Sequence, residues 1–162
     1  MFGGGKLEVI KAQSKEHFQY IRELFREYAN SLDFSLGFQN FDKELKELPG
    51  EYAPPNGCIL IARFNKKIVG CVALRRISKD ICEMKRLYVR PKYRVKGIGK
   101  KLAEAIINEA QNIGYKKMRL DTISFMKKAI ALYESLGFKE IEPYRYNPIE
   151  GARYYELDIN YR

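Results

Sequence analysis

The strongest constraint on the fold is a run of three β-like segments separated by very short turns. Cys58–Phe64, Lys67–Ile77 and Ile81–Val89 are rich in apolar residues, and only Asn65–Lys66 and Ser78–Asp80 separate them. Connections this short can join only antiparallel neighbours, because parallel strands need a crossover of a dozen or more residues. The sequence therefore predicts a three-stranded antiparallel meander near the middle of the chain.

Further strands and helices are predicted on either side of this meander. Apolar residues at helical spacing, with an N-cap serine and glycines at two helix ends, predict helices at Ser14 to about Asn30, Asp42–Leu48, Gly97–Gly114 and Ser124–Leu136. The remaining strands are predicted at Leu7–Ala12, Lys116–Asp121, Phe138–Glu142 and Tyr154–Ile159. This order predicts an α+β (mixed α/β) fold, in which about four helices flank a central mixed, mostly antiparallel sheet of six to seven strands.

The length and composition are those of one folded domain. The chain has 162 residues, of which 46% are hydrophobic and 31% charged, so it is globular rather than disordered. We expect a single domain over residues 1–162, with 1–6 as a flexible lead-in around Gly3–Gly5. No apolar run approaches the roughly 20 residues that span a bilayer, and the start lacks the apolar core of a signal peptide, so no membrane partner is expected.

The cysteines and the single histidine point to a cytoplasmic protein without a metal. Cys58, Cys71 and Cys82 are odd in number, and no two of them have the spacing of a metal-binding or redox pair. Each lies in an apolar stretch, where a free thiol packs as a small hydrophobic group in a reducing compartment. His17 lies in a helical pattern as a solvated or capping residue. We therefore predict a cytoplasmic location and no metal site.

The positive charge of the chain is concentrated at the start of one predicted helix. Thirty Lys and Arg against 20 Asp and Glu give a net charge of +10, which attracts polyanions or serves solubility alone. After the strand ending at Val89, a short basic loop leads into a helix that begins with Gly97 and Gly99. A helix start presents unpaired N–H groups and partial positive charge, and glycines allow an anion to approach closely. The surrounding cations are Arg94, Lys96, Lys100 and Lys101.

Two common phosphate-binding motifs do not fit this turn. A P-loop would need a glycine at position 94 and a Ser or Thr at 101, where Arg94 and Lys101 stand. A dinucleotide-binding fingerprint would need a third glycine at 102, where Leu102 stands, and a βαβ start rather than a meander. A glycine-started helix with a merely solvated basic face remains the simpler alternative.

The segment and its context resemble the Gcn5-related N-acetyltransferase (GNAT) family. The family signature is Gln or Arg, two residues, Gly, one residue, then Gly or Ala, and Arg94–Gly99 matches it. The preceding Leu87–Val89 and proline are similar to the family's fourth strand, and Ala129–Phe138 is similar to its late helix with Leu-Tyr and Gly-Phe. The resemblance covers residues 7–160 and implies the acyl-CoA N-acyltransferase (GNAT) fold.

The resemblance implies acetyl-CoA as cosubstrate and assigns a role to several residues. Main-chain groups of Leu87 and Val89 would pair with the pantetheine arm, and N–H groups from Val95 to Lys100 would hold the pyrophosphate. Tyr133 would be the general acid and Glu83 the general base. Met126 departs from the family, which often has asparagine there for a pantetheine contact. The implied cofactor-binding set is Leu87, Tyr88, Val89, Arg94, Val95, Lys96, Gly97, Ile98, Gly99 and Lys100.

The chemistry of amine acetylation is consistent with these roles. An ammonium group with a pKa near 10.4 must lose a proton before it attacks, and a carboxylate in a closed cleft can relay that proton. Glu83 has apolar neighbours, although a strand glutamate paired with Lys85 or Arg86 is the alternative. A main-chain N–H near Tyr88 or Val89 could stabilise the oxyanion. Tyr133 could protonate the leaving thiolate, or it could be a core aromatic.

The acceptor is expected opposite the cofactor, beside loops rich in aromatic residues: Phe34, Phe38, Tyr144, Tyr146 and Tyr154. These rings could line an acceptor pocket or be ordinary loop packing. The sequence thus predicts direct transfer of acetyl from acetyl-CoA to an amine, small or peptidic, in a ternary complex. The alternatives are an inactive CoA-binding regulator and a basic nucleic-acid-binding module, against which the localised charge argues. No nucleic-acid partner is expected, and a homodimer is compatible with the sequence.

Overall fold

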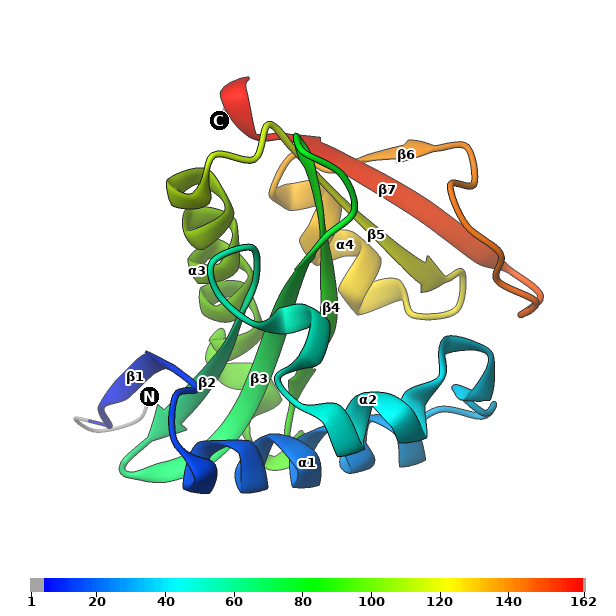
Figure 1. Ribbon diagram of the computed structural model, residues 1–162. Helices are drawn as coiled ribbons and strands as arrows, with labels where there is room; N and C mark the ends of the chain where they lie inside the picture. The colour runs from blue at the N-terminus through cyan, green and yellow to red at the C-terminus, as the bar shows by residue number, and fades with distance from the viewer. Residues whose placement is uncertain (1–4, 162) are drawn as a thin grey trace.

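The computed structural model describes residues 5–161, apart from the side chains of Phe38, Val95 and Tyr161. Part of the predicted lead-in, residues 1–4, lies outside the described residues. Seven strands form one sheet in the order β1-β2-β3-β4-β5-β7-β6 (Figure 1). The strands are β1 (Leu7–Lys11), β2 (Cys58–Phe64), β3 (Lys67–Arg76), β4 (Ile81–Val89), β5 (Lys117–Ile123), β6 (Lys139–Ile141) and β7 (Ala152–Asp158).

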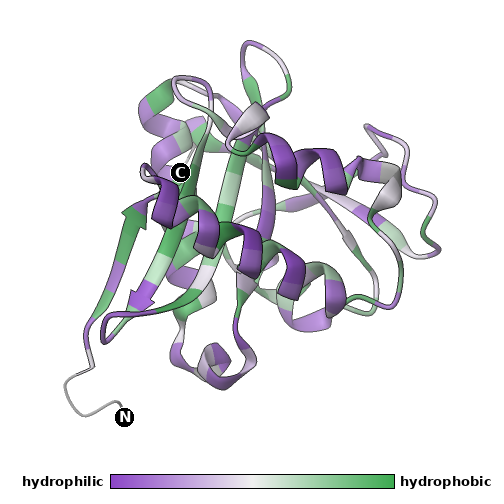
Figure 2. Cartoon of the chain, turned by 60° about the horizontal axis from the view of Figure 1, so that its bottom comes forward, coloured by the Kyte–Doolittle hydropathy of each residue, from purple (hydrophilic) through white to green (hydrophobic). Residues whose placement is uncertain are grey.

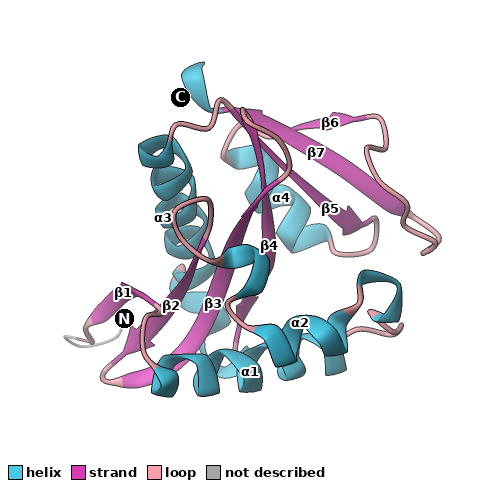
Figure 3. Ribbon diagram, viewed as in Figure 1, coloured by secondary structure: helices cyan, strands magenta, loops and turns pink. Residues whose placement is uncertain are grey.

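Helices cover both faces of this sheet (Figure 3). The α-helices are α1 (Lys15–Asn30), α2 (Phe41–Glu47), α3 (Ile98–Ile113) and α4 (Lys127–Ser135). Four short 3₁₀ helices lie between them or at the chain end: η1 (Gly37–Gln39), η2 (Gly50–Tyr52), η3 (Pro91–Lys96) and η4 (Ile159–Tyr161). The predicted fold class, a mixed and mostly antiparallel sheet flanked by about four helices, is confirmed.

Two hydrophobic cores lie on opposite faces of the central strands. Residues of α1 and α2, including Ile21 and Phe25, pack on one face, while residues of α3, including Leu102 and Ile106, pack on the other. The middle strands are therefore apolar along nearly their whole length rather than alternating, as expected for strands covered on both faces. Figure 2 shows this apolar centre between helices whose outer faces are mostly hydrophilic.

The predicted meander is present, and it leads into a split in the sheet. Strands β2, β3 and β4 pair antiparallel in sequence order. Strand β4 then pairs with β5 in parallel, but only from Ile81–Lys117 to Glu83–Arg119. Beyond this point β5 continues beside β7 while β4 turns away, so the two strands diverge (Figure 1). On the side of β5, the second half of β4 consequently borders an opening, while its other edge remains paired with β3.

A β-bulge in β4 lies next to this split. Cys71 of β3 pairs with Tyr88, whereas Ala73 pairs with Lys85, so Val72 alone faces two residues of β4. Arg86, one of these two, has a φ of 62°, in the left-handed region that a non-glycine side chain seldom adopts. A bulge of this kind bends its strand and re-aims the side chains around it.

The ends of most elements follow the local signals in the sequence. The Ser14 hydroxyl accepts a hydrogen bond from the His17 N–H at 3.1 Å and caps α1, and Gly114 ends α3 with a φ of 110°. Helix α4 begins at Lys127, three residues later than the predicted Ser124. The Ser124 N–H instead donates to the Gly151 carbonyl at 2.8 Å, which ties this turn to the loop before β7. Strand β7 accordingly begins at Ala152, two residues before the predicted Tyr154.

Candidate functional site

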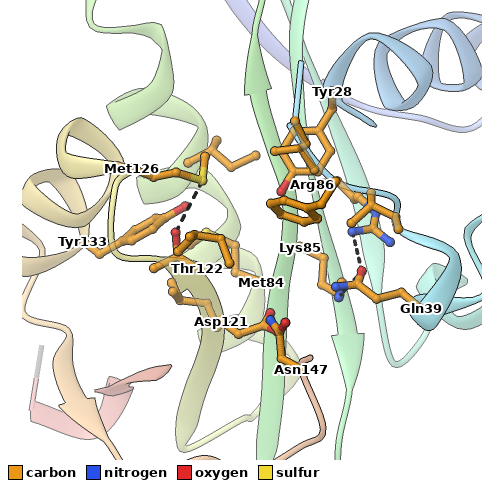
Figure 4. A pocket seen from close by; sticks show the side chains of 17 residues that line it. Tyr28, Gln39, Met84, Lys85, Arg86, Asp121, Thr122, Met126, Tyr133 and Asn147 are labelled. Carbon is orange, nitrogen blue, oxygen red and sulfur yellow. Dashed lines mark hydrogen bonds between the residues drawn. The ribbon is translucent and has the colours of Figure 1, made fainter. Parts of the chain in front are cut away.

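The divergence of β4 and β5 creates a cleft. Its inner part, a cavity of about 100 Å³, lies between Met84–Leu87 of β4 and Leu120–Ile123 of β5. Its outer part, about 410 Å³, continues along Leu87–Val89 towards Arg94 and the start of α4. The two parts share Tyr28, Leu32, Leu87, Met126 and Ala129, and so form one continuous cleft. Figure 4 shows the inner part with side chains from both walls directed into it.

The start of helix α3 lies directly after β4 and has the features of an anion site. Gly97 precedes the helix with a φ of 74°, and in the described chain no side chain caps this helix start. The first N–H groups of a helix lack acceptors within the helix, so those of Ile98, Gly99 and Lys100 can bind a ligand. A Cβ added at Gly97 would meet nothing within 4 Å, so the space in front of this turn is open.

The basic side chains around this turn differ in their contacts. The Arg94 Nε donates to the Val89 carbonyl at 2.8 Å, and its guanidinium lies 5.5 Å from the Tyr88 ring centroid. The Lys96 ammonium lies 5.5 Å from the Phe64 ring centroid, while Lys100 is exposed. Arg94 thus borders the cleft directly.

Tyr133 of α4 forms part of the β5 side of the cleft. Its hydroxyl points into the inner cleft beside Met126 and Thr122 (Figure 4). The other edge of the ring contacts Phe138 at a centroid distance of 5.8 Å. Burial raises the pKa of this hydroxyl, so it stays protonated at neutral pH and can donate a hydrogen bond.

Met126, the departure from the family pattern, also contributes to this wall. It precedes α4 directly, and its sulfur accepts a hydrogen bond from the Thr122 hydroxyl at 3.7 Å. A soft, flexible thioether therefore occupies the position at which the family pattern often has an asparagine amide.

Three charged residues that the sequence analysis did not select as site residues line the inner cleft: Lys85, Arg86 and Asp121. Lys85 of β4 is 6% exposed, and its ammonium donates to the Gln39 side-chain oxygen at 3.0 Å. Burial first, and then the neighbouring Arg86, lower the pKa of Lys85 to about 8. Asp121 of β5 lies across the cleft and accepts from the Asn147 amide at 3.1 Å. The sequence signal for Lys85 was its charge within a mostly apolar strand, which it shares with Glu83 and Arg86, but Asp121 is one acidic residue among 20.

Arg86, next to Lys85, is neutralised within the protein. Its guanidinium donates to both Glu44 carboxylate oxygens, at 2.9 and 3.0 Å, and to the Gln39 oxygen at 2.8 Å. It also stacks over the Phe41 ring, at 5.3 Å from the centroid. Because the bulge turns Lys85 and Arg86 towards the same helices, both cations share Gln39, and only Arg86 also has a carboxylate.

Glu83, the predicted general base, lies at the closed end of the split and is fully buried. Its carboxylate accepts from Arg75 at 2.8 Å, Arg145 at 2.8 Å and the Tyr144 hydroxyl at 2.5 Å. Burial opposes its ionisation, but Lys85, these two arginines and the tyrosine outweigh burial and hold its pKa below the usual value. It is not among the residues that line the cleft. The sequence offered Lys85 or Arg86 as an alternative partner of Glu83. Neither of them donates to its carboxylate, whose hydrogen-bond donors are those three residues.

The aromatic residues of the two loops have different surroundings. Phe34 lines the inner cleft. Tyr144 packs edge-on against Tyr154 at a centroid distance of 5.5 Å, while Tyr146 is 77% exposed. Phe38 was predicted in this group as well, but its side chain lies outside the described residues. Among the predicted loop aromatics whose side chains are described, Phe34 is therefore the one that lines the inner cleft.

The three cysteines are free thiols and are buried, as predicted from their apolar surroundings. Within residues 5–161, no helix combines the length and the apolar character needed to cross a bilayer.

Comparison with known proteins gives consistent results for sequence and fold. The sequence model of the acetyltransferase (GNAT) family matches residues 18–138. The chain is 41% identical over 139 residues to an uncharacterised N-acetyltransferase of Schizosaccharomyces pombe, and the match covers 85% of both proteins.

Solved structures show the same fold. An acetyltransferase of the GNAT family from Staphylococcus aureus superimposes with a TM-score of 0.79 at 21% identity, over 95% of this chain and 99% of the other. The PaiA N-acetyltransferase from Thermoplasma acidophilum, solved with coenzyme A, gives a TM-score of 0.74 at 21% identity, over 94% and 99%. At these identities the likeness concerns the fold alone.

Proposed function

The chain belongs to the acetyltransferase (GNAT) family, and from that membership we propose that it transfers an acetyl group from acetyl-CoA to an amine. Both substrates would occupy the cleft between β4 and β5 at once, and the amine would attack the thioester directly. The acceptor is a small molecule or a peptide or protein amine.

The observation that carries this proposal is the continuity between the open edge of β4 and the start of α3. An unpaired strand edge offers main-chain groups to an extended ligand, and a helix start offers N–H groups to a phosphate. Coenzyme A contains an extended pantetheine arm joined to a pyrophosphate. Leu87 and Val89 would bind the arm, the N–H groups of Val95–Lys100 would bind the pyrophosphate, and Arg94 would add positive charge beside it.

The leaving group and the oxyanion would be stabilised from opposite walls. The Tyr133 hydroxyl, directed into the cleft, would protonate the sulfur as the C–S bond breaks. A main-chain N–H of Tyr88 or Val89 would stabilise the oxyanion that forms on the attacked carbonyl. The thiolate is itself a fair leaving group, because thiols have a pKa near 8.5. Protonation by the tyrosine would therefore increase the rate without being essential for it.

The proton lost by the amine would pass to a carboxylate. Glu83 remains our prediction from the sequence, with transfer through water, because Glu83 does not itself line the cleft. Asp121 is the competing candidate, because it lines the cleft itself. The pH–rate profiles of Glu83→Gln and Asp121→Asn distinguish them, since removal of the true base should lower kcat/KM most strongly below the pKa of the amine, where the substrate is still protonated.

A combined binding and turnover experiment tests the proposed function. Acetyl-CoA at about 100 times its Kd should stabilise the fold by about 2.7 kcal/mol, which is about 5–10 °C in Tm for a chain of this length. Adenosine should have little effect, because it lacks the pyrophosphate. Release of free thiol with a panel of amines then measures transfer. No shift with millimolar acetyl-CoA would rule out the binding site, whereas a shift without thiol release from any amine would favour a non-catalytic CoA-binding regulator.

A further inference from the structure

The inner cleft carries opposite charges on its two walls. Lys85 lies on β4, and Asp121 lies on β5 beside Asn147 (Figure 4). Leu87, Leu120 and Ile123 line the same cavity, and Lys85 is buried beside them, while Asp121 is half-buried. Charges in such a place interact strongly with a ligand, because the local dielectric constant is lower than that of water.

Lys85 is paired differently from the buried Arg86 and from the half-buried Arg75 and Arg145. Arg86 has the carboxylate of Glu44, and both Arg75 and Arg145 have that of Glu83. Within residues 5–161, the hydrogen bond of the Lys85 ammonium is to the amide oxygen of Gln39, and no carboxylate lies within salt-bridge distance of it. Gln39 shares that oxygen with Arg86, so it neutralises neither cation.

A buried cation without a carboxylate partner is costly, and proteins seldom retain one without a use. The other charged groups that act on Lys85 are Arg86 and Arg75, which oppose its charge, and Glu83 and Asp121, which favour it. Glu83 is already occupied by its three donors, whereas Asp121 lies on the opposite wall, where it accepts from Asn147 and can still accept from an ammonium group. A ligand carboxylate in the cavity would supply the missing partner.

We propose that the acceptor is an amino acid, whose carboxylate binds Lys85 while its amine faces Asp121. This inference rests on the proposed acetyl transfer and adds the chemical class of the acceptor. The zwitterion matches the cleft in sign on both walls, with its carboxylate on the β4 side and its ammonium on the β5 side. A plain amine or a polyamine would leave Lys85 without a partner and would add a second positive charge beside it.

Matched acceptor pairs test the carboxylate directly. Each amino acid is compared with its own amide in the thiol-release assay, so that the side chain and the position of the amine stay constant. A hydrogen-bonded ion pair predicts a kcat/KM about 10- to 100-fold higher for the acid. The amine of the amide is less basic and loses its proton more easily. This difference alone would favour the amide, so a higher kcat/KM for the acid cannot arise from it.

The variant Lys85→Met removes the charge and keeps a long apolar side chain. It should reduce the acid-to-amide ratio of kcat/KM to 1 or below, mainly by raising KM for the acid. Replacing a buried charge with an apolar group of similar size is often neutral or stabilising, so Tm should not fall. Lys79→Met, in the exposed turn between β3 and β4, is the matched control and should keep the wild-type ratio.

Three results would overturn the carboxylate site: amides used as well as acids by the wild type, an unchanged ratio in Lys85→Met, or no calorimetric binding of any of the 20 amino acids to the CoA-saturated protein. These outcomes differ from failure of the proposed function. That failure would be no binding of acetyl-CoA, or no thiol release with any amine, whether or not it carries a carboxylate.

Discussion

Gly97→Asp is the most informative single substitution, because the structure separates its effect on the fold from its effect on cofactor binding. The residue is exposed, and a Cβ there would meet nothing within 4 Å. The cost to the fold comes from its φ of 74° and amounts to about 1–2 kcal/mol for a residue with a side chain. A carboxylate at a helix start regains about 0.3–1 kcal/mol from the helix dipole. We therefore expect Tm to fall by only a few degrees.

The effect on cofactor binding should be much larger. Two unit charges about 4 Å apart near a protein surface interact by about 4 kcal/mol, and solvent and salt reduce this at an exposed position. We expect an increase in the acetyl-CoA Kd of about 10- to 100-fold, measured by calorimetry at low ionic strength. Added salt should reduce the difference in acetyl-CoA Kd between the variant and the wild type, because it screens the repulsion between the two negative charges.

The matched control is Gly97→Asn, which has the same shape without the charge and tolerates the left-handed region well. Both variants should lose similar stability, whereas the aspartate variant should bind acetyl-CoA far more weakly than the asparagine variant. Equal dissociation constants in the two variants would show that no phosphate lies at this helix start, and the reasoning would fail.

Three other substitutions test the chemistry and the buried charges. Tyr133→Phe keeps the packed ring, so Tm should barely change while kcat and kcat/KM fall together; undiminished turnover in a chemistry-limited assay would exclude the acid role. Glu83→Gln leaves Arg145 without a counter-charge and Arg75 with the exposed Glu51, and it should cost about 3–5 kcal/mol of stability. The pKa of Glu83 is lower in the folded than in the unfolded protein. The ionised carboxylate therefore stabilises the fold above about pH 4.3, and this stabilisation is lost as the pH falls through the pKa of Glu83 in the folded protein. Glu83→Gln should consequently lose less Tm on acidification than the wild type. Asp121→Asn should preserve the acetyl-CoA Kd and lower kcat/KM for the acceptor; an unchanged value would remove Asp121 from the acceptor site.

Much of the fold follows from local signals in the sequence. Connections of two and four residues force the antiparallel meander, the second one residue longer than predicted, and the caps at Ser14 and Gly114 have their predicted geometry. The start of α3 was also predictable, because Gly97 and the basic loop are contiguous in the sequence. These features depend on residues within a few positions of one another, where turn and helix chemistry dominate.

The features that depend on distant segments were not predictable. The partners of Glu83 include Tyr144 and Arg145, which lie 61 and 62 residues away and reach it only through the loop before β7. An isolated strand pattern could not reveal that this carboxylate is saturated with donors. It suggested instead a carboxylate that faces a cleft.

The bulge in β4 has a similar origin. Arg86 adopts a positive φ although it is not glycine, and its contacts with Glu44, Gln39 and Phe41 on another element hold it there. No turn signal marks this position in the sequence. As a result, the direction of Lys85 into the cleft became visible only in three dimensions.

Amide hydrogen exchange with and without acetyl-CoA tests the central claim most directly, because it locates the cofactor on the chain. The first N–H groups of α3 lack helical acceptors, and the open edge of β4 lacks a strand partner, so both should exchange readily in the free protein. The account predicts that acetyl-CoA slows exchange at Leu87–Val89 and at Gly97–Lys100. Unchanged exchange in both segments at a saturating concentration, with protection elsewhere, would contradict it.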